Sequence, residues 1–454
     1  MSIAEAAHAV GGRTHGAPVR FTSVSTDSRS IEAGALFVAL RGERFDAHGF
    51  IGAVKACGAA AAMVDEASGL ATQTPGIPCV AVDDTRLALG RLAGHWRARF
   101  SIPLVAVAGS NGKTTVKEMI AAILRAHYGE QATLATEGNL NNDIGLPMTL
   151  LRLRPAHRAA VIEVGMNHPG ETAHLVAIAQ PTVALVNNAQ REHQEFMKGV
   201  QEVAREHGAA FAALSADGTA VINADDRYAA YWRSLVRPEQ IRDFGIGQPA
   251  AVSGRYTLSD FSSDIVLTAP EGRVDFRLQM PGLHSVRNAV AAAAGATAAG
   301  ADIAMVASGL AGFTALKGRL QIRRGRGGAV IVDDTYNANP DSARAAIDVL
   351  RALPGRRILV LGDMGEVGEQ GEAFHRETGR CAAEAGLDEL LAIGSLAAHA
   401  FAEFGEGGVW YARFEDLVDD VAKKALAGTS ILVKGSRFMR MERVVAALVD
   451  GAQY

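Results

Sequence analysis

The segment 104–124 constrains the fold of this chain more strongly than any other part of its sequence. An apolar, β-branched run at 104–108 leads into a loop with two glycines, and a helical pattern at 116–124 follows directly. A strand, a loop and a helix in this order point several backbone N–H groups at one place, which favours phosphate oxygens. The loop residues that we expect to bind a nucleotide are Gly109, Ser110, Asn111, Gly112, Lys113, Thr114 and Thr115.

This loop is tighter than the usual G-x-x-x-x-G-K-[ST] motif, because Val107 stands at the position of the first glycine. Lys113 supplies a mobile cation for the outer phosphates, and a hydroxyl of Thr114 or Thr115 can bind magnesium. The alternative is an ordinary glycine-rich strand–helix turn that carries a surface lysine. Because strand, loop and helix are in register, we favour the phosphate-binding interpretation.

The alternation of strand-like and helical patterns over 454 residues predicts an α/β protein of three domains. Continuous apolar runs at 104–108, 159–164, 182–186 and 219–222 are typical of a parallel sheet that helices cover on both faces. We predict a small N-terminal α/β domain, a central phosphate-loop domain with a parallel sheet and a C-terminal Rossmann-like domain, at residues 1–85, 86–316 and 317–454.

Composition narrows the class of protein further. A hydrophobic content of 48% is typical of a globular chain, and a net charge of −4 gives no reason to expect nucleic-acid or membrane-surface binding. The three cysteines, Cys57, Cys79 and Cys381, are too far apart for a metal motif or disulfide framework, so we expect inert or buried thiols. No secretory signal or membrane-spanning apolar run is evident, which predicts a cytoplasmic protein without membrane insertion.

Two polar residues follow strands that we expect to lie beside the phosphate loop. Glu163 stands within the apolar run 161–165, where a carboxylate is costly unless a cation meets it. His193 follows the next expected strand, and ligands gather at the carboxyl ends of such strands. A strand-end salt bridge and a solvated loop histidine are the alternatives. Since both residues and the loop with Thr114 follow successive strands, we predict a magnesium site there.

The C-terminal domain carries polar clusters at several expected strand ends. Asp334 and Asn337 follow one strand, and Asn339 before Pro340 can also cap the next helix. The last strand ends in Lys434, Ser436 and Arg437, and the arginine suits a carboxylate or a phosphate. Each cluster alone is weak evidence, but together they predict a cleft that faces the central domain.

These motifs together resemble the Mur ligases over nearly the whole chain, and most closely the branch that adds D-alanyl-D-alanine. The resemblance rests on the phosphate loop and on the stretches 139–147, 163–171, 223–226, 333–342, 361–366 and 434–437. The Tyr-Asn-Ala-Asn-Pro stretch at 336–340 and the Gly-Asp-Met-Gly-Glu stretch at 362–366 are the parts most specific to that branch.

The resemblance implies a function for each domain. The N-terminal domain would hold the UDP end of UDP-N-acetylmuramoyl-tripeptide, with contacts at Asp27, Ser28 and Arg29. The central domain would bind ATP and Mg²⁺, and the C-terminal domain would bring D-alanyl-D-alanine through Asn337, Lys434, Ser436 and Arg437. The nucleotide contacts that it implies are Asn288 at the adenine, Arg319 near the phosphates and Asp334 at the ribose. Magnesium would lie at Thr114, Glu163 and His193.

One departure from the family pattern concerns residue 207. Mur ligases commonly carry a carbamylated lysine that helps to hold a second magnesium, whereas the matching stretch here ends in His207-Gly208. Neutral imidazole supplies no negative charge. We therefore expect His207 to act as a ligand, directly or through water, or Glu206 to supply the charge. A shifted carbamate on Lys198 is a weaker alternative. In each of the first two cases activity should not need bicarbonate.

The activity implied is ATP-driven amide formation through an acyl phosphate by a monomeric enzyme, with Lys113, Glu163, His193 and His207 in catalysis. A folate-chain glutamate ligase resembling folylpolyglutamate synthase would share the nucleotide site, but 336–340 and the uridine-like N-terminal domain disfavour it. A nucleotide-dependent switch protein would hydrolyse ATP slowly without a second substrate. The third residue of the acceptor peptide, diaminopimelate or lysine, stays open.

Overall fold

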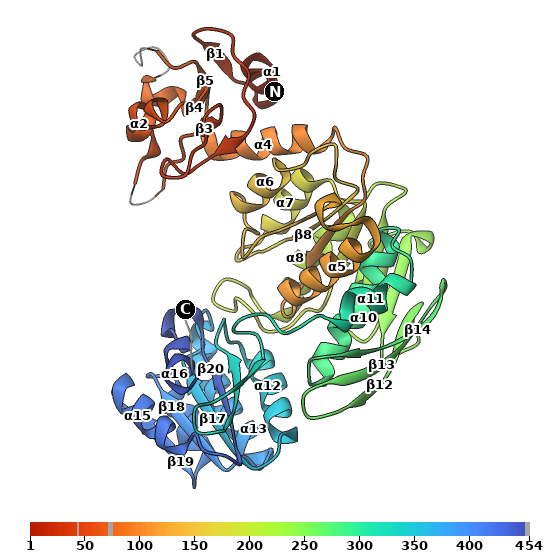
Figure 1. The fold of residues 1–454 in the computed structure, drawn as a ribbon, viewed down its shortest axis with the longest axis vertical. Helices are drawn as coiled ribbons and strands as arrows, with labels where there is room; N and C mark the ends of the chain where they lie inside the picture. The colour runs from red at the N-terminus through yellow and green to blue at the C-terminus, as the bar shows by residue number, and fades with distance from the viewer. Residues whose placement is uncertain (43–44, 71–75, 450–454) are drawn as a thin grey trace.

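The computed structural model describes residues 1–42, 45–70 and 76–449, and within them three β-sheets follow one another along the chain. The sheets form three bodies along the long axis of the molecule, with the N-terminus in the first and the C-terminus in the last (Figure 1). No helix in this described part is long and apolar enough to cross a membrane.

The first body has five strands in the order β1-β5-β4-β3-β2, all parallel to their neighbours except β1. Strands β3, β4 and β5 are buried throughout, whereas the edge strands β1 and β2 are partly exposed. The elements are α1 (Ile3–Val10), β1 (Arg13–His15), β2 (Val24–Ser25), β3 (Leu36–Val38), α2 (Ile51–Ala56), β4 (Ala61–Asp65) and β5 (Cys79–Val82). Cys57 is exposed rather than buried, while Cys79 lies in the core strand β5.

The central body has nine strands in the order β14-β13-β12-β11-β10-β9-β6-β8-β7. Its strands are β6 (Leu104–Ala108), β7 (Thr133–Ala135), β8 (Ala159–Glu163), β9 (Val183–Val186), β10 (Thr219–Asn223), β11 (Ile241–Gly245), β12 (Val252–Leu258), β13 (Ser263–Ala269) and β14 (Gly272–Leu278). Its helices are α4 (Thr85–Arg97), α5 (Lys113–Tyr128), α6 (Gly145–Leu150), α7 (Glu171–Ala179), α8 (Val200–Ala212), α9 (Ala229–Arg233), α10 (Leu283–Ala298) and α11 (Ala304–Ala311).

The sheet of this body is mixed: the four strands predicted from continuous apolar runs are parallel, and the antiparallel strands at one edge were not foreseen. Strands β7 to β12 pair in parallel, but β12, β13 and β14 form an antiparallel meander. In β13 buried and more exposed residues alternate, which is the pattern of a sheet with one face on the core and one in water. That alternation, unlike the continuous apolar runs of β6 and β8, distinguishes antiparallel strands in the sequence.

The third body is a six-stranded sheet in the order β15-β16-β20-β17-β18-β19, parallel except for the edge strand β15. Its elements are β15 (Gln321–Arg324), β16 (Val330–Asp334), α12 (Pro340–Ala352), β17 (Arg356–Gly362), α13 (Gly371–Glu384), β18 (Glu389–Ile393), α14 (Ala397–Phe404), β19 (Gly408–Tyr411), α15 (Phe414–Lys424), β20 (Thr429–Lys434) and α16 (Glu442–Leu448). Asn339 caps α12 with a capping box and Pro340 is its first residue, as the sequence indicated.

Candidate active site

The phosphate loop lies between β6 and α5, at the carboxyl edge of the central sheet. Gly112 has a φ of +82°, and a Cβ there would stand 2.6 Å from Oδ1 of Asn288. Gly109 has a φ of +128°, and its Cβ would meet the backbone nitrogens of 187 and 188 at 3.0 Å. Both glycines are therefore needed for conformation and for space. Because β6 lies between β8 and β9, the segments that follow all three strands meet here, as expected.

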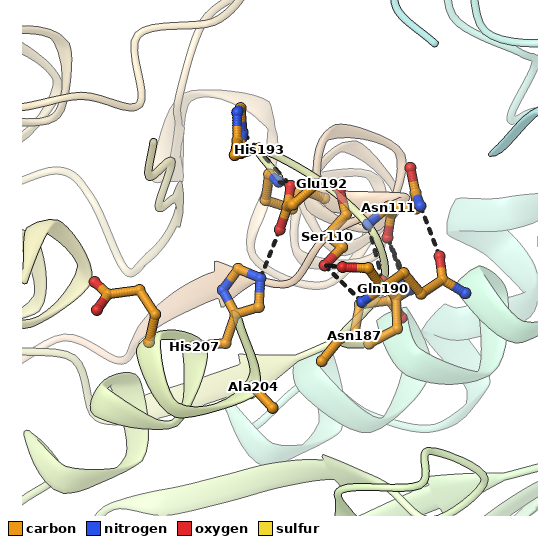
Figure 2. A network of polar contacts seen from close by, with 12 residues as sticks. Ser110, Asn111, Asn187, Gln190, Glu192, His193, Ala204 and His207 are labelled. Carbon is orange, nitrogen blue, oxygen red and sulfur yellow. Dashed lines mark hydrogen bonds and ion pairs between the residues drawn. The ribbon is translucent and has the colours of Figure 1, made fainter. Parts of the chain in front are cut away.

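A segment after β9 holds the loop in shape. The backbone N–H of Ser110 donates to the carbonyl of Asn188 (3.0 Å), and that of Asn111 donates to Oδ1 of Asn188 (2.8 Å). The N–H of Gln190 donates to Oγ of Ser110 (2.9 Å), and Asn111 Nδ2 donates to Oε1 of Gln190 (2.6 Å), as Figure 2 shows in part. Sequence reasoning missed Asn188 and Gln190 as partners of the loop. The amide side chains that directly follow a predicted strand could have indicated these contacts.

Lys113 forms an ion pair that the sequence did not indicate. Its Nζ lies 3.1 Å from Oε2 of Glu192 and donates to the carbonyl of Ser110 at 3.2 Å. Burial alone would raise the pKa of Glu192, but the charge of Lys113 and the hydrogen bond with His207 lower it to about 2. Glu192 is therefore an ionised carboxylate beside the phosphate loop.

Glu163 is the last residue of β8 and is 3% exposed. Asn141 Nδ2 donates to its Oε1 at 2.7 Å, while its Oε2 is buried and has no hydrogen-bond partner. A buried carboxylate oxygen without a partner is costly, so this oxygen fits a cation. Thr114 and His193 line the same cavity as Glu163.

His193 has a φ of +48°, and its Nδ1 lies 2.6 Å from Oε2 of Glu366 in the C-terminal domain. This contact lowers the pKa of Glu366, against the burial that would raise it. Within residues 1–42, 45–70 and 76–449, no three His, Cys, Asp or Glu side chains form a ready metal cage. Mg²⁺ usually takes one or two carboxylates, several waters and substrate phosphates, so the single orphaned oxygen of Glu163 fits that ion.

The cavity at this place has a volume of about 890 Å³ and is lined by both the central and the C-terminal domains. Asn288 and Arg319 line it, and the guanidinium of Arg319 lies 3.9 Å from the ring centroid of Tyr336. Asp334 lines it too, but its Oδ1 accepts from the N–H of Leu320 (3.1 Å) and its Oδ2 accepts from Lys434 Nζ (2.5 Å).

Some predicted substrate contacts have other partners. Lys434 is buried and also donates to the carbonyl of Asn337 (2.9 Å), so its ammonium is already neutralised within the domain. Ser436 is buried, accepts from the N–H of Gly365 (2.8 Å) and donates to the carbonyl of 338. Arg437 is exposed and lies 3.5 Å from Glu442, outside the cavity lining. Lys434 lines the cavity, and direct substrate binding by Lys434 and Ser436 stays a prediction; both side chains also have hydrogen-bond partners within their own domain, as buried polar groups usually do.

The N-terminal contacts lie apart from this cavity. Asp27 and Arg29 form a local ion pair at 2.7 Å, and neither they nor Ser28 line the cavity. His207 does not line it either, since it is fully buried in α8. The carboxylate of Glu206 accepts from the N–H groups of Gly170 (2.9 Å) and 172 (2.8 Å) at the start of α7, so Glu206 does not supply the missing charge.

Arg191 joins the central domain to the C-terminal domain. Its guanidinium binds Asp341 (2.7 Å) and Glu377 (2.6 Å), and its backbone N–H donates to Asp341 Oδ2 (2.8 Å). Asn339 Nδ2 also donates to Oδ1 of Asn111 in the phosphate loop at 2.9 Å. The C-terminal domain therefore packs directly against the loop. Sequence reasoning missed Arg191, and a lone loop arginine offers no signal that could have found it.

Three family models match the chain. They are described as the Mur ligase family catalytic domain at residues 20–97, the Mur ligase middle domain at 107–296 and the Mur ligase glutamate ligase domain at 318–437. Among curated proteins, UDP-N-acetylmuramoyl-tripeptide–D-alanyl-D-alanine ligase of Escherichia coli K12 is 40% identical, with 99% of this chain and 98% of the relative covered. The protein of the same name from Bacillus subtilis 168 is 32% identical, with 94% and 93% covered.

Solved structures agree with these matches. A crystal structure of MurF from Acinetobacter baumannii has a TM-score of 0.89 and 35% identity, with 98% of this chain and 97% of that chain covered. MurF ligase from Thermotoga maritima in complex with ADP has a TM-score of 0.79 and 26% identity, with 94% and 96% covered. With its three matched domains and full-length relatives, the chain belongs to the Mur ligase family.

Proposed function

We propose that this chain is an ATP-dependent ligase that adds D-alanyl-D-alanine to UDP-N-acetylmuramoyl-tripeptide in the synthesis of peptidoglycan precursors. Its full-length kinship with ligases of that name carries this proposal. The geometry supports it, because the phosphate loop and the C-terminal domain line one cavity with the volume of a nucleotide-sized site. Since one chain completes the cavity, we propose that the enzyme is a monomer. Since its proposed substrates are ATP and a UDP-linked peptide, we propose that it acts in the cytoplasm.

The chemistry has two steps. The terminal carboxylate of the tripeptide attacks the γ-phosphorus of ATP in line, which forms an acyl phosphate and releases ADP. The amine of D-alanyl-D-alanine then attacks the acyl carbon, phosphate leaves, and the new amide nitrogen loses a proton. Both steps concentrate negative charge on phosphoryl oxygens, which Lys113 and the N–H groups of the loop stabilise. Packing of the C-terminal domain against the loop excludes water from the acyl phosphate.

We assign the remaining predicted residues within this scheme. Thr114, Glu163 and His193 would hold magnesium, which supplies positive charge against the phosphate oxygens when bound. Asn288, Arg319 and Asp334 would contact the nucleotide. Asn337 would contact the amine substrate, with Lys434 and Ser436 bracing its loop and Arg437 at the outer edge. Asp27, Ser28 and Arg29 would meet the uridine diphosphate end of the acceptor.

Mass spectrometry of the reaction product tests the proposal. Purified protein with ATP, Mg²⁺ and D-alanyl-D-alanine should convert a UDP-N-acetylmuramoyl-tripeptide to the pentapeptide, with either diaminopimelate or lysine as its third residue. ADP release should require both peptide substrates. ADP release with L-glutamate and a folate acceptor, and none with the peptides, would instead support the folate-chain ligase. Slow ADP release that ignores both peptides would support a switch protein.

A further inference from the structure

The carboxylate of Glu192 is the centre of a chain of three side chains that ends at the phosphate loop. Its Oε1 lies 2.8 Å from Nε2 of His207, and its Oε2 lies 3.1 Å from Nζ of Lys113. Figure 2 shows His207 reaching from α8 towards Glu192, with Ser110 of the loop nearby. The side chain of Glu192 is 6% exposed, so neither oxygen is free to exchange partners with bulk water.

The surroundings of His207 show which atom donates in the hydrogen bond between His207 and Glu192. Its ring is buried, and its Nδ1 has no hydrogen-bond partner in the structure. A proton on that nitrogen would be a buried donor without an acceptor, which is costly. The proton of the neutral ring therefore lies on Nε2, from which it donates to Glu192. His207 acts as a support for the carboxylate and does not reach the cavity lining.

The contacts of Lys113 leave one of its hydrogens for substrate. An ammonium has three donors, and two of them are directed at Glu192 and at the carbonyl of Ser110. Lys113 lines the cavity, so the third donor is available to a phosphate oxygen. Two fixed acceptors thus aim the third N–H, which is the kind of preorganisation that lowers a barrier to phosphoryl transfer.

We propose that Glu192, supported by His207, is a positioning residue that aims the Lys113 ammonium, and that this fixed carboxylate replaces the carbon-dioxide-derived charge of the usual family lysine. The inference rests on the proposed function, because it concerns the same phosphoryl transfer. It also explains the departure at residue 207: a histidine cannot carry the carbamate, but it can hold the neighbouring carboxylate of Glu192 in place beside Lys113. The enzyme should therefore need no bicarbonate.

The test compares Glu192→Gln, His207→Leu and His207→Gln in the ligase assay. Glu192→Gln and His207→Leu should each lower kcat about 10- to 100-fold, the range for losing one hydrogen bond to a charged group, with KM for D-alanyl-D-alanine unchanged. The double variant should be no slower than Glu192→Gln. His207→Gln should recover most of kcat, because its amide can donate to Glu192. Thermal unfolding of each variant checks that it folds.

The matched control is Glu195→Gln, which makes the same charge change at an exposed position three residues further along the loop, and it should keep wild-type kcat. Wild-type kcat in carbon-dioxide-free buffer should not change when bicarbonate is added, and ¹³C-bicarbonate should give no carbamate signal in NMR spectra. Wild-type kcat in Glu192→Gln, a fall as large in His207→Gln as in His207→Leu, or rescue by bicarbonate would overturn the proposal. Absence of any product from the wild type would instead refute the function.

Discussion

Replacing Arg191 with alanine should open the interface between the central and C-terminal domains. Its side chain is 23% exposed, and the guanidinium contacts Asp341 and Glu377 of the C-terminal domain and lies 5.3 Å from the ring centroid of Phe374. The hydrogen bonds with Glu377 and Asp341 raise the pKa of Arg191 beyond its ordinary value, against the desolvation that would lower it. The charge is therefore fixed at every pH at which the protein is folded.

The size of the effect follows from this partial burial. An exposed ion pair contributes up to about 1 kcal/mol, and breaking a buried pair costs about 3–5 kcal/mol. Arg191 lies between these limits, so we expect the alanine variant to lose about 2 kcal/mol of interdomain contact free energy. That loss corresponds to a roughly 30-fold smaller equilibrium constant for packing of the two domains. Since the packed arrangement excludes water from the acyl phosphate, kcat should fall with it.

Small-angle scattering and kinetics on the same samples check this expectation. Arg191→Ala with bound nucleotide should have a larger radius of gyration and a lower kcat than wild type. The control is Arg344→Ala, which also pairs with Glu377 (3.2 Å) but is 58% exposed and lies within the C-terminal domain. It should change neither quantity. If both variants gave the same radius of gyration and the same kcat, Arg191 would have no role in domain packing.

Three further perturbations have defined outcomes. Lys113→Ala should cost about 3 kcal/mol in the transition state, measured as kcat/KM for ATP, and an unchanged value would remove Lys113 from the mechanism. Gly112→Ala should weaken ADP binding measured by calorimetry, because its Cβ would collide with Asn288, whereas Gly170→Ala has a similar positive φ but no atom within 4 Å and should bind ADP normally. Burial lowers the pKa of His375 below its ordinary value of 6.5. As pH falls below 6.5 the unfolded chain binds a proton at His375 before the folded chain does, so the free energy of unfolding decreases. The loss should disappear in His375→Gln, as urea unfolding at pH 7 and pH 5 can measure.

The parts of the site that follow the central strands could be predicted from sequence, because the sheet topology determines which loops lie close together. Continuous apolar runs predict parallel strands, and parallel strands bring their carboxyl ends to one edge. The sequence therefore predicts that Glu163 lies beside the phosphate loop, and β6 does pair with β8. The antiparallel strands β12 to β14 were missed because their alternating pattern was not weighed against the parallel expectation.

The ion pairs of the site could not be predicted in the same way. Arg191 and Glu192 lie in an irregular segment where no periodicity says which way a side chain points. The sequence places Lys434 and Ser436 after the last strand, but it did not indicate the partners that these buried side chains have within their own domain. His207 departs from a family pattern that the sequence shows, but nothing in the sequence indicates that its partner is a glutamate 15 residues earlier.

The segment 187–195 contacts both the phosphate loop and the C-terminal domain. Its first residues hold the phosphate loop, through Asn188 and Gln190, and the next ones contact the C-terminal domain, through Arg191 and His193. Glu192 lies between them and contacts Lys113, the lysine that we propose binds the phosphates. A phosphate that binds Lys113 therefore also affects Glu192. The two chain neighbours of Glu192, Arg191 and His193, contact the C-terminal domain. Because a short backbone segment cannot shift one residue without its neighbours, nucleotide binding and domain packing should share one free-energy change. A double-mutant cycle between Arg191→Ala and Glu192→Gln on ADP affinity should therefore show coupling, and additive effects would mean that the segment does not transmit one event to the other.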